Sequence, residues 1–300
     1  MTLGSNKNSS SLKLHSPAKV NLFLAVHGKR ADERHELTSL MAALDFGDCL
    51  TVRRREGEDR LYCDNGMAPK GPDNLVLLAS RAFREKTGTD TSFSFELKKR
   101  IPVGAGLGGG SGNAATALCG MNALLDNPLD HEELAALAAG IGSDCPFFLD
   151  ARPSVVRGRG EVLEPLHADA ANRLRGMRLA LFQPPFSIDT GRAYRRLAAE
   201  APETYQDSDW AEEQLRWFTT GGSIEELLFN AFERPIGWKY LALPALLGNL
   251  RTKGQRCLMS GSGSCCFALL NDGGASSEEL RKIVKEAWGD AAFFVESLIL

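Results

Sequence analysis

The 300-residue chain lacks any apolar run long enough to cross a membrane, and its polar opening, Met1 to Ser11, lacks the apolar core of a signal peptide. It also lacks a strong charge of either sign, since 35 lysines and arginines face 38 aspartates and glutamates. This balance gives no electrostatic reason to expect binding to nucleic acid or to a membrane surface. The sequence therefore predicts a cytoplasmic globular protein with a short disordered lead-in; it does not distinguish a monomer from a homodimer.

Paired cysteines of the kind that bind zinc or form a redox site are missing as well. The seven cysteines contain no C-x-x-C spacing and are odd in number. Several lie in apolar surroundings, among them Cys119 and the adjacent Cys265 and Cys266. We expect buried, reduced thiols rather than disulfides or a metal site.

Glycine, in contrast, is concentrated in one stretch. Residues 102–113 read Pro-Val-Gly-Ala-Gly-Leu-Gly-Gly-Gly-Ser-Gly-Asn and lie between a basic run at 98–100 and a helical pattern at 114–125. Backbone without Cβ atoms lets N–H groups approach an anion, and a helix N-terminus directs further N–H groups and its positive dipole to the same point. The stretch predicts a phosphate cradle, and a glycine-rich hinge without a ligand is the alternative.

Two common kinds of phosphate loop are excluded by context. A Walker A loop ends in Gly-Lys-Ser/Thr, whereas Gly110 is followed by Ser-Gly. The spacing G-x-G-x-x-G is present from Gly104 to Gly109, and Asp126 lies near the distance of a ribose-binding acid. That acid should end a second buried strand, however, and residues 92–97 alternate like a half-buried strand instead of running apolar into the turn. The sequence therefore does not predict a dinucleotide-binding fold.

Isolated polar residues elsewhere are ambiguous from spacing alone. Lys19 and Asn21 point the same way on a predicted strand, and a solvated face with an extended lysine is the plainer interpretation. His35 follows a charged turn, and Asp144 lies between Gly-Ser and Cys-Pro, where a turn or cap is typical. Spacing alone assigns none of the four a function.

Strands and helices are interspersed without regular repetition, which favours an α+β fold with two lobes divided near residue 165. Strands are expected at 11–16, 17–27, 50–54, 60–63, 92–97, 177–183, 256–259, 265–270 and 291–295, with a hairpin at 154–163 and a strand or helix at 37–44. Helices are expected at 73–86 with Asp73 as N-cap, 114–125, 130–140, 192–199 with Thr190 as cap, 224–232, 241–251 and 276–288. The strands at 50–54 and 60–63 are expected to pair, and 201–218 to be a variable surface segment.

Three of these stretches together resemble the three motifs of the GHMP small-molecule kinases. They are Pro17-Ala-Lys-Val-Asn-Leu-Phe-Leu, the glycine stretch continued through Ala-Ala-Thr, and Ser260-Gly-Ser-Gly-Ser-Cys-Cys-Phe-Ala. Further matches occur in the same order from about residue 14 to 270, and they are Gly28-Lys-Arg-Ala-Asp, His35-Glu-Leu, Asp45-Phe-Gly-Asp48, Asp73-Asn-Leu, Gly142-Ser-Asp-Cys-Pro-Phe-Phe and Gly158-Arg-Gly-Glu161.

The resemblance implies a two-lobed GHMP kinase fold. Its ATP-binding N-terminal domain, like domain 2 of ribosomal protein S5, would span 12–165, and its ferredoxin-like C-terminal domain would span 166–300. The resemblance also implies transfer of the γ-phosphoryl group of ATP, with Mg²⁺, to the 2-hydroxyl of cytidine diphosphate methylerythritol in the non-mevalonate isoprenoid pathway. That chemistry relies on positioning and charge stabilisation more than on covalent help.

The same resemblance implies roles for individual residues. Asp144 would accept or orient the hydroxyl proton, and Lys19 beside it would keep that carboxylate ionised and counter the charge of the transferred group. Ser111 would lie at the Mg²⁺ edge, and the turn at 260–264 would close over the site. The ATP-binding positions are Asn74, Lys99, Pro102, Val103, Gly104, Ala105, Gly106, Leu107, Gly108, Gly109, Gly110, Ser111, Gly112 and Asn113. The substrate-binding positions are Asn21, Arg34, His35, Thr190 and Tyr194, with His35 toward the cytosine.

The chain departs from the family pattern near the site. Asp-Glu-Arg-His ends at His35 where the family has Asp-Gly-Tyr-His, whose tyrosine stacks on the cytosine. A guanidinium such as that of Arg34 can itself stack on a base, and Tyr194 matches a second aromatic position. Gly112 stands where a second serine is common, and Ser262 where threonine is usual.

Two other functions stay open. Another GHMP kinase, acting on mevalonate, homoserine or a sugar, would keep the phosphate loop and change the acceptor pocket. A nucleotide-binding protein without catalysis would need neither Lys19 nor Asp144, so the presence of both speaks against it.

Overall fold

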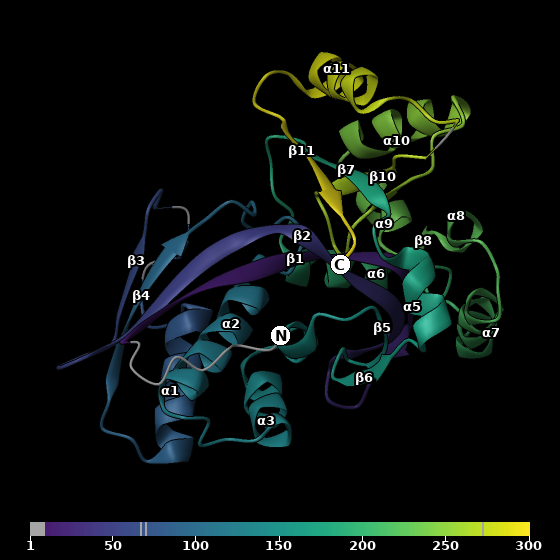
Figure 1. The fold of residues 1–300 in the computed structure, drawn as a ribbon. Helices are drawn as coiled ribbons and strands as arrows, with labels where there is room; N and C mark the ends of the chain where they lie inside the picture. Colours follow the sequence, from purple (N-terminus) through teal and green to yellow (C-terminus); the bar gives the residue numbers. More distant parts are fainter. Residues whose placement is uncertain (1–9, 67, 70, 272) are drawn as a thin grey trace. The chain divides into compact units, whose positions relative to one another are not determined.

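The computed structural model describes residues 10–300 apart from 67, 70 and 272 (Figure 1). The predicted lead-in lies almost wholly outside the described residues. The chain divides into two compact units, the first made of Met1–Ala18, Gly47–Val103 and Gly108–Ala151 and the second of Lys19–Phe46, Gly104–Leu107 and Arg152–Leu300. The predicted domains, 12–165 and 166–300, follow the chain in order, and their boundary stays a prediction.

The first unit packs helices on a sheet. Strand β2 (His35–Arg55) pairs antiparallel with β4 (Ser92–Lys98), and β3 (Arg60–Cys63) pairs parallel with β4. Helices α1 (Leu75–Thr87), α2 (Gly109–Leu124) and α3 (His131–Ile141) contact one another, and Figure 1 shows α1 and α2 side by side. The pairing predicted for 50–54 with 60–63 is wrong, because β4 lies between these strands. Its alternating Phe93, Phe95 and Leu97 are all buried and suit an inner strand.

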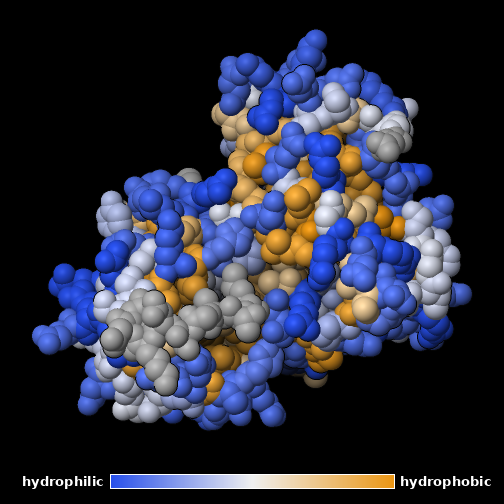
Figure 2. Space-filling view, in the orientation of Figure 1, coloured by the Kyte–Doolittle hydropathy of each residue, from blue (hydrophilic) through white to orange (hydrophobic). Residues whose placement is uncertain are grey.

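The second unit contains two sheet regions. In the first, β2 pairs with β5 (Ser154–Gly158), β5 with β6 (Val162–Pro165), and β1 (Ser11–Lys29) with the short β8 (Phe229–Asn230). The second is a four-stranded antiparallel sheet in the order β11 (Phe293–Leu298), β7 (Arg178–Gln183), β10 (Cys266–Leu269) and β9 (Cys257–Met259). Figure 2 shows apolar side chains reaching the surface near β11, where Leu298 is 40% exposed. The predicted hairpin at 154–163 is confirmed.

The remaining helices complete the two units. In the first unit α4 (Phe147–Asp150) is a single turn after α3. In the second, α10 (Ala242–Thr252) and α11 (Ser277–Trp288) contact each other, α10 contacts β9, and α11 contacts β7. The other helices of the second unit are α5 (Ala168–Leu174), α6 (Thr190–Ala199), α7 (Ser208–Thr219), α8 (Ile224–Leu227) and α9 (Glu233–Gly237).

Two predicted helix caps are displaced by one residue. Asn74, not Asp73, caps α1 by accepting a hydrogen bond from the Val76 N–H. Asp189, not Thr190, caps α6 in the same way. A hydrophobic period locates a helix but does not fix its first residue. The capping box predicted at Asp130 is confirmed.

Two predicted elements are wrong in extent or kind, and a third segment contains a helix that was not predicted. The strands at 11–16 and 17–27 form one strand, β1, because Pro17 removes one backbone donor but its φ is compatible with extended backbone. The helix predicted at 224–232 is one turn, α8, followed by β8. The segment 201–218 contains α7, which buries Leu215 and Phe218 and is therefore part of the folded structure.

All seven cysteines are free thiols. Burial raises the pKa of Cys145 to about 12 and that of Cys257 to about 11, so both thiols are protonated at neutral pH. None of the helices in the described part of the chain has the length and apolar character needed to cross a membrane.

Candidate active site

The middle of the glycine stretch, Gly104–Leu107, is held by other parts of the second unit. The Lys19 N–H donates to its last carbonyl at 3.0 Å, and the Ser260 hydroxyl donates to the Gly106 carbonyl at 3.2 Å. Gly106 has a φ of 78°, and a Cβ there would lie 2.1 Å from the Ser260 carbonyl oxygen. Only glycine fits this contact. The turn at 260–264 thus contacts the glycine stretch directly.

Lys19 and Asn21 are buried beneath the same turn. Each is 4% exposed, so the solvated face that spacing favoured is wrong. The Lys19 ammonium donates to Asn21 Oδ1 at 2.5 Å, and Asn21 Nδ2 donates to the Ser39 hydroxyl at 2.8 Å. A Cβ on Gly261 would lie 3.4 Å from both Asn21 Oδ1 and Lys19 Nζ. A buried, oriented ammonium beside a glycine loop can stabilise negative charge that develops during a reaction.

Asn230, which the sequence analysis did not single out, holds the turn at 260–264 by hydrogen bonds. Its Nδ2 donates to the Met259 carbonyl at 2.7 Å and to the Gly261 carbonyl at 2.8 Å, while its Oδ1 accepts from the Phe232 N–H. The turn is also joined to α6, since the Thr190 and Ser262 hydroxyls are 3.0 Å apart. An amide inside the apolar run Phe-Asn-Ala-Phe was the available signal.

His35 and Tyr194, both predicted to bind the substrate, meet in the second unit. Their rings stack with centroids 4.8 Å apart and planes inclined by 29°. His35 Nε2 is buried and has no hydrogen-bond partner among the described residues. Burial, with a smaller effect of the Lys29 charge, lowers the pKa of His35, so its ring is neutral near pH 7. Arg34, in contrast, is exposed.

In the first unit, the glycine stretch itself forms the start of α2. The helix begins at Gly109, five residues before the start predicted at 114, with Gly108 as a left-handed N-cap. The Gly112 N–H already bonds to the Gly108 carbonyl at 2.8 Å. The N–H groups of residues 109–111 therefore point out of the helix N-terminus, where an anion would be bound. Because glycine has a low helix propensity, the sequence predicted a later start for this helix.

A buried carboxylate, Asp48, fastens both ends of this stretch. It accepts hydrogen bonds from the Lys99 ammonium, from the Arg100 and Ile101 N–H groups at 2.7 and 2.8 Å, and from Asn113 Nδ2 at 2.9 Å. The side chains of Lys99 and Asn113 are thus engaged in this network, and that of Asn74 caps α1. Their contact with ATP stays a prediction.

Asp144 lies in the first unit, in the turn that follows α3. The Cys145 N–H closes this turn on the Gly142 carbonyl at 3.0 Å. A Cβ on Gly142 would lie 3.2 Å from the Cys145 sulfur and 4.0 Å from the Ser111 hydroxyl oxygen. The turn that carries Asp144 is therefore next to the N-terminus of α2.

The departure at Gly112 has a structural counterpart. A Cβ there would lie 3.0 Å from the Pro17 carbonyl oxygen and 3.2 Å from Ser16 Oγ. We expect Gly112→Ser to lower the free energy of unfolding by about 1–2 kcal/mol, because the backbone of β1 must move to admit it. Urea denaturation measures this, with Gly110→Ser as the matched control, since a Cβ there would meet only Leu75 at 3.4 Å. Equal stabilities of the two variants would contradict the expectation.

Comparison with known proteins places these features in a family. Residues 74–152 match the model of the GHMP kinases N terminal domain. The chain is 39% identical over 259 residues to 4-diphosphocytidyl-2-C-methyl-D-erythritol kinase of Protochlamydia amoebophila, covering 86% of this chain and 84% of the relative. It is 38% identical over 271 residues to the protein of the same name from Thermotoga maritima, covering 88% and 94%.

A solved structure agrees with these relatives. The crystal structure of a 4-(cytidine 5'-diphospho)-2C-methyl-D-erythritol kinase superposes with a TM-score of 0.75 at 33% identity, covering 96% of this chain and 99% of that one. The predicted GHMP kinase fold is confirmed by this likeness.

Proposed function

Because the chain belongs to the 4-diphosphocytidyl-2-C-methyl-D-erythritol kinases, within the GHMP kinases, we propose that Lys19 and Asp144 catalyse its phosphoryl transfer. The chain is an ATP-dependent kinase that phosphorylates the 2-hydroxyl of 4-diphosphocytidyl-2-C-methyl-D-erythritol in the non-mevalonate isoprenoid pathway. The 2-hydroxyl oxygen bonds to the γ-phosphorus, the bond from that phosphorus to the β,γ-bridging oxygen breaks, and ADP leaves. Asp144 accepts the hydroxyl proton.

The observation that carries the catalytic assignment is the buried Lys19. Lys19 is 4% exposed, and its ammonium is oriented by Asn21 and adjoins the glycine stretch. Such a cation can stabilise the negative charge that moves from the γ- to the β-phosphate during phosphoryl transfer. Neither a hinge nor a solvated strand face requires a buried cation, because its desolvation is costly.

ATP is held, in this proposal, by the glycine stretch and the N–H groups of residues 109–111. Mg²⁺ bound to ATP takes most of its ligands from phosphates and water, so a single protein oxygen such as the Ser111 hydroxyl fits its needs. Within the described residues no group of three or more His, Cys, Asp and Glu side chains is arranged to hold a metal. Bound there, Mg²⁺ would neutralise phosphate charge.

The substrate that receives the phosphoryl group binds at the residues of the second unit that the sequence predicted for it. His35 and Tyr194 take the cytosine, with the neutral His35 Nε2 as acceptor for an amino group, and Asn21 and Thr190 contact the remainder. We place the reaction in the cytoplasm, with the chain as monomer or homodimer and with neither nucleic acid nor a membrane as partner.

The test is ADP release by the purified protein with Mg-ATP, comparing the cytidylyl methylerythritol with mevalonate, homoserine and galactose. We expect turnover with the first acceptor alone. Turnover with another acceptor would keep the phosphate site and change the function. ATP binding without turnover on any of them would favour a nucleotide-binding protein without catalysis.

The lowered pKa of His35 predicts the pH dependence of substrate binding. A free histidine titrates near about pH 6.5, and because burial lowers the pKa of His35, its neutral form persists to lower pH. We expect the KM for the cytidylyl substrate to stay constant from about pH 8 to below about pH 6.5 and to rise only on further acidification. Initial rates across this range measure it, with the KM for ATP as internal control. A rise centred at or above the ordinary histidine pKa would contradict the expectation.

A further inference from the structure

The segment Thr204–Gln206, which precedes α7, is held by hydrogen bonds to two other elements of the second unit. The Gln206 N–H donates to the Val26 carbonyl at 2.9 Å, and Gln206 Oε1 accepts from the Val26 N–H at 3.0 Å, so Gln206 is bonded to β1. On the other side, the Thr204 hydroxyl donates to the Leu197 carbonyl at 2.6 Å, in the last turn of α6. The segment is therefore tied both to the strand that leads toward His35 and to the helix that carries Tyr194.

His27 strengthens the attachment to β1. Its Nδ1 lies 2.9 Å from the Gln206 carbonyl oxygen, which can only accept, so Nδ1 carries the proton. Its Nε2 lies 2.8 Å from the Thr38 hydroxyl. Both ring nitrogens are thus engaged, and the backbone of Gln206 is held by a side chain as well as by the strand.

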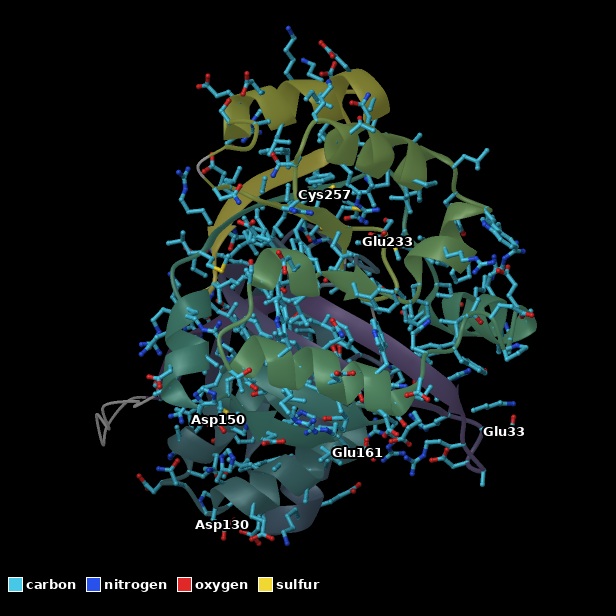
Figure 3. The ribbon with its side chains drawn as sticks, turned by 90° about the vertical axis from the view of Figure 1, so that its right-hand side faces the viewer. Glu33, Asp130, Asp150, Glu161, Glu233 and Cys257 are labelled. Carbon is cyan, nitrogen blue, oxygen red and sulfur yellow. The ribbon has the colours of Figure 1, made fainter. Side chains whose placement is uncertain are left out.

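These attachments place the Tyr205 ring against His35. The two centroids are 6.0 Å apart and the planes are inclined by 56°, while Tyr194 stacks on His35 at 4.8 Å. His35 therefore has two tyrosines as neighbours, one from α6 and one from the segment before α7. Figure 3 shows Glu33, the residue before the exposed Arg34, at the tip of the turn between β1 and β2.

We propose that Tyr205, as the second aromatic neighbour of His35, is a specificity-determining residue that contacts the pyrimidine ring bound at His35. The pyrimidine ring of the substrate is the ligand, so this inference rests on the proposed function. A tyrosine whose backbone is already fixed loses little conformational entropy when a planar heterocycle binds, whereas an exposed arginine must be ordered first.

Steady-state kinetics with Tyr205 variants test the proposal. Tyr205→Ala is expected to raise the KM for the cytidylyl substrate about tenfold, as for the loss of one base-stacking partner, with kcat and the KM for ATP unchanged. Tyr205→Phe, which keeps the ring, should restore the KM, and Tyr205→Leu should not. Tyr62→Ala, at a tyrosine 66% exposed on β3, is the matched control and should match the wild type.

A second readout does not depend on turnover. Binding of cytidine 5'-diphosphate, measured by calorimetry, should weaken in Tyr205→Ala by the same factor as the KM rises. Unchanged binding and unchanged KM would overturn the proposal, as would a larger loss in Arg34→Ala than in Tyr205→Ala. If the wild type phosphorylates no cytidylyl substrate but Tyr205→Ala still loses nucleotide affinity, the proposed function fails and the inference about Tyr205 stands.

Discussion

Asp144→Asn is expected to lower kcat about 10³-fold while ATP still binds, because the amide keeps the shape of the carboxylate but cannot accept the proton of the substrate hydroxyl. The change removes the basicity and the negative charge of Asp144 but keeps a hydrogen-bond acceptor of the same shape at that position. Single-turnover kinetics measures the chemical step, and calorimetry with a non-hydrolysable ATP analogue measures binding.

Asp150→Asn is the matched control for this variant. Asp150, on α4 (Figure 3), lies 3.3 Å from the His131 ring, and its side chain is 50% exposed. Loss of one carboxylate from this helix should leave kcat unchanged. Turnover retained in Asp144→Asn would remove Asp144 from the mechanism, and loss of ATP binding together with turnover would assign it to the nucleotide site instead.

The order of strands and helices was largely predictable, because hydrophobic periods and cap residues are local signals. Burial of individual polar residues was not. Lys19 alternates with apolar neighbours as a solvated lysine on a strand does, but in the fold the turn at 260–264, more than 200 residues away, lies against its ammonium. The family motifs indicated a catalytic role for Lys19, whereas its spacing on the strand favoured a solvated position.

The start of α2 and the content of 201–218 escaped prediction for different reasons. Glycine disfavours a helix in isolation, but in the folded first unit Gly109 has no room for a side chain, since a Cβ there would lie 2.8 Å from Lys99 Nζ. In 201–218 the acidic composition conceals an apolar face formed by Ala211, Leu215 and Phe218. Tyr205 belongs to no motif, and its position follows from the hydrogen bonds that its neighbours Thr204 and Gln206 make to α6 and to the distant strand β1.

Asp48→Ala is expected to lower the free energy of unfolding by about 3–5 kcal/mol, because it leaves the buried Lys99 ammonium without its counter-charge. Both side chains are almost fully buried, at 0% and 4% exposed. The change also removes the acceptor of the Arg100 and Ile101 N–H groups, so the entry to the glycine stretch should loosen and the KM for ATP should rise.

The double variant Asp48→Ala/Lys99→Met separates these two effects. If the uncompensated charge dominates, removing the ammonium as well should recover part of the stability, whereas the KM for ATP should stay raised because both N–H groups remain without their acceptor. Glu96→Ala is the surface control, since it breaks the exposed pair with Arg53 at 3.4 Å and should cost at most about 1 kcal/mol. Equal losses in Asp48→Ala and Glu96→Ala would mean that the buried pair holds neither the fold nor the phosphate loop. A stability loss that the double variant does not recover would trace the destabilisation to the backbone donors at residues 100 and 101.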